Sequence, residues 1–137
     1  FGNPRRVSNG VEYNRAMLLL AVLEKRGGLL LGNCDAYLNV IGGLSLDEPA
    51  ADLAAMLALA SSFRDKPVPS DLAAIGEVGL TGELRAVSNL GQRLSEVRRL
   101  GFSKCLIPKR IQGKLAAPEG LELIRVANIR EALAALL

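Results

Sequence analysis

The stretch Leu44–Arg64 constrains the fold of this chain more than any other, because its middle carries a single charge, Asp52. Its apolar residues recur at helical spacing and form one stripe: Leu53, Met56, Leu57, Ala60 and Phe63. The opposite side is alanine, and a helix that is apolar all round is typically buried. We expect Asp47 to cap the helix and a turn at Asp65–Pro69 to end it. The sequence therefore predicts a central core helix.

The rest of the chain alternates between helical and strand patterns. Helices are expected at 12–26, 89–100 and 129–137, the last capped by Asn128, and strands at 36–41, 72–78, 83–87, 104–107 and 121–126. Gly42-Gly43 breaks the first strand, and the turn Gly79–Gly82 makes the next two a hairpin. The turn formers in Phe1–Gly10 predict a loop there. One α/β domain with a mixed sheet and packed helices is the expected fold.

Composition excludes several kinds of site. The chain has no histidine among its 137 residues, which rules out Ser-His-Asp and Cys-His catalysis, and its two cysteines lack the spacing of a zinc site. Nothing matches a phosphate-binding loop. Two unpaired thiols indicate a reducing, cytoplasmic setting. The longest apolar run, Ala16–Leu23, is too short to cross a bilayer, no signal peptide is visible, and the opening residues FGNPRR read as part of a longer protein.

One long block allows a more specific prediction. The block DEPAADLAAMLALASSFRDKPVPSDLAAIGEVGLTGELRAVSNLGQRL resembles the proteolytic domain of Lon proteases, in which DGPSAG, a helix, a PV turn, TGE, a strand and GGLKEKL follow in the same register. With FGNPRR and EYNRAMLLLAVLEKR included, nearly the whole chain is similar to the C-terminal Lon-like domain of the bacterial RadA (Sms) family, RecA-related DNA repair proteins. This resemblance implies the Lon protease-like fold, also called ribosomal protein S5 domain 2-like.

The residues at the catalytic positions depart from the Lon pattern. Lon proteases use a Ser–Lys dyad, and in register the nucleophile position is Ala50 and the base position is Arg93. A guanidinium stays protonated at physiological pH and cannot act as a general base. Asp52 replaces the glycine after the nucleophile pair, and Ser61, Ser62 and Ser88 do not lie at this turn. We expect no peptidase activity, and we expect Arg93 to pair with Asp52 or Asp47 and so lock the former cleft.

The resemblance implies a non-catalytic scaffold that binds DNA without sequence preference and assembles as a hexameric ring. In that family a zinc motif and an ATPase precede this domain, so ATP, Mg and Zn are expected only upstream, with branch migration as the activity and RecA as a candidate partner. No membrane partner is expected. A pure assembly scaffold without DNA contact is the alternative, and a residual Ser–Lys peptidase is the least favoured.

Cations at loops and element ends are the candidate DNA contacts, because phosphates bind mobile Lys and bidentate Arg. With a net charge of +3 the chain is only mildly basic, so solvated surface charge is the competing interpretation of each cation. The pair Arg5-Arg6 is preferred, because no acidic residue lies near it before Glu12. Arg64 and Lys66 are partly offset by Asp65, and scarce aromatics argue against base stacking. The candidates are Arg5, Arg6, Lys25, Arg26, Arg85, Arg98, Arg99, Lys104, Lys109 and Arg110.

Overall fold

The computed structural model describes residues 4–40 and 47–136. Its helices are α1 (Tyr13–Lys25), a 3₁₀ turn (Pro49–Ala51), α2 (Asp52–Arg64), α3 (Leu90–Arg99) and α4 (Ile129–Leu136). Its strands are β1 (Arg6–Asn9), β2 (Ala36–Asn39), β3 (Leu72–Ala74), β4 (Glu77–Val78), β5 (Leu84–Arg85), β6 (Lys104–Pro108) and β7 (Glu122–Val126). The predicted strand end at Ile41, the break at Gly42-Gly43, the start of the stretch at Leu44 and the terminal residues Phe1 and Leu137 lie outside the described residues.

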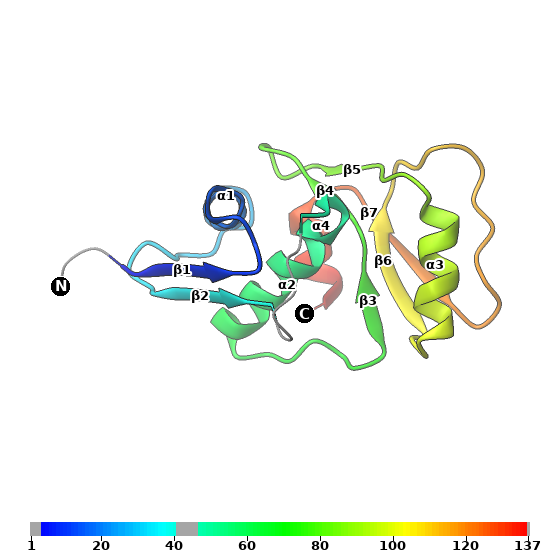
Figure 1. Ribbon diagram of the computed structural model, residues 1–137, viewed down its shortest axis with the longest axis horizontal. Helices are drawn as coiled ribbons and strands as arrows, with labels where there is room; N and C mark the ends of the chain where they lie inside the picture. Colours follow the sequence, from blue (N-terminus) through cyan, green and yellow to red (C-terminus); the bar gives the residue numbers. More distant parts are fainter. Residues whose placement is uncertain (1–3, 41–46, 137) are drawn as a thin grey trace.

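Parallel and antiparallel pairings are both present, as the α/β prediction requires, and they are distributed over separate small sheets. β3, β6 and β7 form a parallel sheet in the order β3-β6-β7, and β1 pairs in parallel with β2. β4 and β5 form the antiparallel hairpin. In Figure 1 the β3-β6-β7 sheet stands between α3 on one side and α2 with α4 on the other. None of the helices in residues 4–40 and 47–136 is long and apolar enough to span a membrane.

Strand β6 divides the apolar core in two, because successive side chains on a strand point to opposite faces. Leu106 packs in the larger core, which is formed mainly by α1, α2 and α4. Cys105 and Ile107 point the other way, into a smaller core with Leu94 of α3. Burial raises the pKa of the Cys105 thiol to about 12. This layered packing fixes α2 and the turn before it at the centre of the molecule.

Helix α2 confirms most of the predicted core stripe but begins differently from the prediction. Leu53, Met56, Leu57 and Ala60 are buried, whereas Phe63 is 42% exposed, so its assignment to the core was wrong. Ala54 and Ala58 are also exposed, and the helix is therefore not buried all round. The 3₁₀ turn precedes α2, and no side-chain cap is formed at the start of either, so the prediction that Asp47 caps the helix was wrong. The turn after α2 is confirmed, with Asp65 in the left-handed conformation at φ 57°.

Two other segments differ from the sequence prediction because their structure depends on distant partners. Residues 6–9, predicted as loop, form β1 by pairing with β2 about thirty residues later. The strand predicted at 72–78 divides into β3 and β4 at Ile75-Gly76. Here the Ile75 N–H donates to the Leu106 carbonyl and the Gly76 N–H to the Ala50 carbonyl, both at 2.9 Å. The chain thus leaves the parallel sheet and enters the hairpin through a contact with the turn before α2.

Candidate functional site

The turn that precedes α2 is built tightly into the fold. Ala50 is 6% exposed and packs with the smaller core, and its carbonyl accepts from Gly76. The Leu53 N–H donates to the Gly76 carbonyl at 3.1 Å, which completes a two-way link between this turn and the β3–β4 connection. The side chain at the position predicted for a nucleophile, Ala50, is thus a buried methyl group. It offers neither an oxygen nor a sulfur for attack on a carbonyl.

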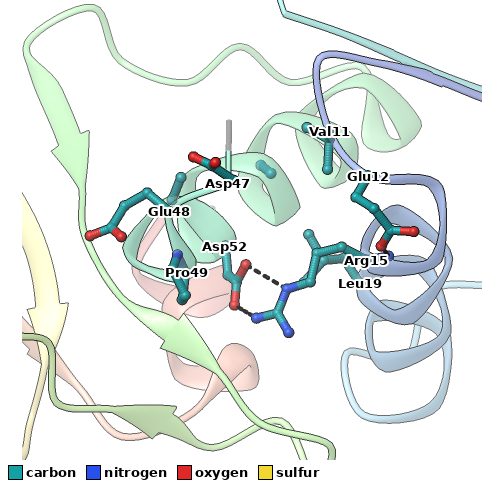
Figure 2. A pocket seen from close by; sticks show the side chains of 10 residues that line it. Val11, Glu12, Arg15, Leu19, Asp47, Glu48, Pro49 and Asp52 are labelled. Carbon is teal, nitrogen blue, oxygen red and sulfur yellow. Dashed lines mark hydrogen bonds and ion pairs between the residues drawn. The ribbon is translucent and has the colours of Figure 1, made fainter. Parts of the chain in front are cut away.

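Asp52, in the first turn of α2, is the buried charge at this position. Its side chain is 5% exposed, and Figure 2 shows it facing Arg15 of α1. Arg15 Nε donates to Asp52 Oδ1 at 3.0 Å and Nη2 donates to Oδ2, which gives a bidentate pair. The Val78 N–H of β4 also donates to Oδ2, at 3.1 Å. One carboxylate therefore joins α1, α2 and β4.

Arg93 of α3 pairs with Glu48, and the predicted pairing with Asp52 or Asp47 was wrong. Nη2 of Arg93 donates to a Glu48 carboxylate oxygen, and Nε donates to the Ser88 carbonyl at 2.8 Å. The Asp52 carboxylate accepts from Arg15 and the Val78 N–H instead. Arg93, at the position predicted for the base, therefore binds the turn before α2 through Glu48, the residue that precedes Pro49. Arg15 was not predicted as a partner from the sequence, where its only signal is a charge just before the apolar middle of α1.

A cavity of about 230 Å³ lies between α1 and this turn. Figure 2 shows it bounded by Val11, Glu12 and Leu19 on the α1 side and by Asp47, Glu48 and Pro49 on the other. Glu12 is committed to capping α1, where its carboxylate accepts from the N–H groups of Asn14 and Arg15. Among the described residues that line the cavity there is no Ser, Thr, Cys or Lys. The described lining therefore consists of carboxylates, apolar side chains and one arginine.

Two basic hollows adjoin the β4–β5 hairpin. Lys25, Arg26 and Arg130 line the first hollow, together with Thr81, Gly82, Asn128 and Ile129. Arg85, Lys109 and Arg110 line the second, together with Glu83, Leu84, Ala86 and Ala127. The hollows meet where Glu83 bridges to Asn128. Six cations thus share one stretch of surface with a single lining carboxylate.

Backbone geometry brings the hairpin turn against the end of α1 and the start of α4. Gly82 has φ +81°, and its carbonyl accepts from the Ile129 N–H at 2.8 Å. A Cβ at this position would lie 2.9 Å from the Cβ of Arg26, so a side chain there would collide with the end of α1. Arg130 Nε donates to the Arg26 carbonyl at 3.0 Å, which holds three cations together. Arg130 was not among the predicted DNA contacts, since only the fold places it beside Lys25 and Arg26.

Glu83 is the carboxylate between the two hollows, and it is neutralised locally. The Thr81 hydroxyl donates to it at 2.6 Å and Arg85 pairs with it at 3.2 Å. The Thr81 hydrogen bond is the main cause that lowers the pKa of Glu83 from 4.5 to about 2, with Arg85 contributing. Glu83 is therefore ionised at neutral pH and cancels one of the six positive charges. The net charge of the two hollows together remains strongly positive.

The structure separates the remaining candidate cations from these hollows. Arg5 is exposed, whereas Arg6 turns inward and its Nη2 donates to the Leu31 carbonyl at 2.8 Å. Arg98 donates to the Glu119 and Phe102 carbonyls, and Arg99 pairs with Glu96. Lys104 is exposed at the opposite end of β6 from Lys109. Half of the ten candidates, namely Lys25, Arg26, Arg85, Lys109 and Arg110, thus come together around the hairpin.

Comparison with known proteins shows which proteins this chain is similar to. A family model described as the Lon protease (S16) C-terminal proteolytic domain matches residues 34–137. The chain is similar to the "DNA repair protein RadA" of Bacillus subtilis strain 168, with 56% identity, and to that of Listeria monocytogenes, with 50%, each over 97% of the chain and 29% of the relative. With the Streptococcus pneumoniae protein of the same name the identity is 49%, over 97% of the chain and 32% of the relative. The chain thus spans about three tenths of the length of these relatives.

Proposed function

The chain belongs to the family of Lon protease C-terminal proteolytic domains. We propose that it is a non-catalytic member of this family and that it binds DNA. Its relatives are named DNA repair proteins, which supports a role in DNA repair and recombination. The resemblance to the RadA family extends the proposal to a scaffold within a ring-forming, RecA-related ATPase that promotes branch migration. On this proposal ATP, Mg and Zn are held by segments outside these residues.

The loss of peptidase activity is proposed from the three substituted positions. Ala50 is buried without a nucleophilic atom, Arg93 is an ion-paired guanidinium, and Asp52 fills the turn with a bound carboxylate. Each substitution alone removes a different requirement of Ser–Lys chemistry. Together they convert the former catalytic turn into a packed structural joint.

The observation that carries the DNA-binding proposal is the pair of basic hollows at the hairpin. Lys109 and Arg110 are exposed immediately after β6, next to Arg85, and Lys25, Arg26 and Arg130 continue the same positive surface. Phosphates attract such cations whatever the base sequence, so the contact is expected to be non-specific and salt-dependent. The preferred pair from the sequence, Arg5-Arg6, contributes less on this view because Arg6 faces the protein.

The test measures DNA binding by Lys109→Ala/Arg110→Ala across a salt series. The readout is the fluorescence anisotropy of a labelled 40-mer, in single- and double-stranded form. The matched control is Arg64→Ala/Lys66→Ala, which removes the same charge from an exposed turn after α2. Loss of up to two phosphate contacts should reduce the salt slope by about 1 to 2 for duplex DNA, with the control unchanged. Equal losses in both variants would indicate only a net-charge effect, and no binding by the unaltered chain would favour the pure assembly scaffold.

A further inference from the structure

A separate groove of about 450 Å³ lies between β2 and the last turns of α2. Tyr37, 60% exposed, comes from β2, and Phe63, 42% exposed, comes from α2. Ala58 and Leu59 of α2 also line the groove, and Arg6 of β1 reaches it from the neighbouring strand. Two exposed aromatic side chains on one groove form an apolar surface for which the DNA-binding proposal has no use.

Among residues 4–40 and 47–136, β2 pairs only with β1, and residues of β2 line this groove. The Ala36 N–H donates to the Arg5 carbonyl at 2.8 Å and the Val40 N–H to the Asn9 carbonyl at 2.9 Å. In a parallel pair alternate residues bond to the neighbouring strand, so the peptide groups of Tyr37 and Asn39 point to the other edge. Within the described residues this sheet contains only β1 and β2, and Tyr37 and Asn39 both line the groove. An unpaired edge of this kind is a template for an added strand.

Arg6 supplies a second, independent feature of the groove. Its Nη2 donates to the Leu31 carbonyl at 2.8 Å, but its Nη1 is buried and has no acceptor among residues 4–40 and 47–136. The nearby Asp35 directs Oδ1 to the Arg5 N–H at 2.7 Å. Leaving a buried guanidinium donor without an acceptor is unfavourable, and Arg6 can remove that penalty by turning Nη1 toward an oxygen bound in the groove that it lines.

We propose that this groove binds an extended peptide segment of a partner protein by strand addition to β2. The backbone of the segment pairs with Tyr37 and Asn39, an apolar side chain packs against Tyr37 and Phe63, and a carboxylate accepts from Arg6. An extended polypeptide can pair with the free backbone groups. An apolar side chain fits the aromatic pair, and a carboxylate fits the cationic donor. This site is distinct from the basic hollows, and the proposal does not depend on DNA binding.

The test uses an array of octapeptides that alternate Val or Leu with Thr and carry Asp, Asn or Lys at one polar position. The chain should bind a subset of the Asp peptides, and methylating alternate backbone amides should abolish that binding. Arg6→Met should weaken binding of the Asp peptides about tenfold or more, since a charge-assisted hydrogen bond is lost. Because Arg6→Met could disturb β1, Phe63→Ser is the second variant, and Leu80→Ser, which alters an exposed leucine outside the groove, is the matched control.

The thiols of the chain report occupancy directly. Cys34 lines the groove, whereas Cys105 is fully buried with a raised pKa, so a thiol reagent should modify Cys34 alone in the folded chain. A bound peptide should slow modification of Cys34, and Phe63→Ser should remove this protection. Absence of binding by any peptide, equal loss in Leu80→Ser, or indifference to backbone methylation would overturn the proposal. Self-association that Phe63→Ser abolishes would also overturn it, by identifying a second copy as the occupant.

Discussion

Removing Arg15 tests whether the Arg15–Asp52 pair holds the degenerate turn in place. Arg15→Ala leaves the Asp52 carboxylate only 5% exposed, with the Val78 N–H as its remaining partner. A buried charge that has lost its counter-ion is much more costly than a lost surface contact. The expected result is therefore a large loss of stability from a single substitution on α1.

The magnitude follows from the burial of the two partners. Removing one member of a buried pair costs about 3–5 kcal/mol, and the 31% exposure of Arg15 places this case near the lower value of about 3 kcal/mol. A domain of this kind is stable by about 5–15 kcal/mol, so the variant should still fold. Asp52→Ala should lower the free energy of unfolding less through the loss of its charge, because the partly exposed Arg15 can be hydrated. It leaves the buried Val78 N–H unpaired, at about 1–3 kcal/mol.

The assay is a double-mutant cycle of Arg15→Ala and Asp52→Ala, with urea unfolding followed by circular dichroism because the chain has no tryptophan. The double variant should be no less stable than Arg15→Ala alone, since removing the carboxylate removes the unpaired charge. The coupling free energy should be about 2–3 kcal/mol, within the range known for residues in contact. Unchanged m-values would show that the stability changes do not arise from changes in the denatured state.

Arg99→Ala is the matched control, because it breaks an Arg–Glu pair that is exposed on both sides. Exposed pairs contribute little to stability, and we expect no change that urea unfolding resolves. The proposed structural role of the Arg15–Asp52 pair is refuted if Arg15→Ala destabilises the chain no more than Arg99→Ala. It is refuted equally by two single effects that simply add in the double variant.

Two further predictions concern the acid response and the proposed loss of peptidase activity. The folded pKa of Glu83 is lowered to about 2, so its contribution to stability is present above pH 4.5 and is lost as the pH falls toward 2. Glu83→Gln should therefore lose less stability on acidification than the unaltered chain in urea unfolding at pH 7, 4 and 2.5, and parallel curves would contradict this. Ala50→Ser/Arg93→Lys should not hydrolyse labelled casein, because Asp52 still fills the turn and Glu48 still attracts the cation. Turnover above that of the unaltered chain would contradict the account of the turn.

Local patterns predicted the elements that are stabilised by their own periodicity. Helices α1, α3 and α4 and strands β6 and β7 lie where the sequence placed them, and Asn128 caps α4 by accepting from the Glu131 N–H at 2.9 Å. The errors fall where a distant partner decides the structure. β1 exists because β2 pairs with it, and the break at Gly76 follows from its bond to Ala50. No local pattern in Phe1–Gly10 or 72–78 contains that information.

The site shows the same division between local and distant information. The resemblance to Lon proteases predicted Ala50, Asp52 and Arg93 as the substituted positions, and in the structure all three lie at or against the turn before α2. Their partners could not be read in the same way, because Arg15 lies on another helix, 37 positions from Asp52, and competes for the same carboxylate. A sequence shows which charges are present. Only the fold shows which of these charges lie close enough to pair.

This competition also decides which cations are available to a phosphate. A guanidinium that already donates to carbonyl oxygens, as Arg98 does to Glu119 and Phe102, is held in place and has fewer of its five N–H groups left for a phosphate. Lys109 and Arg110 are exposed, and no hydrogen bond from either side chain is found among the described residues, so their binding carries no such restriction. Equal charges in the sequence are therefore unequal as DNA contacts. The comparison of Lys109→Ala/Arg110→Ala with a second double variant, Arg98→Ala/Arg99→Ala, measures that inequality directly: only the first should lower the salt slope.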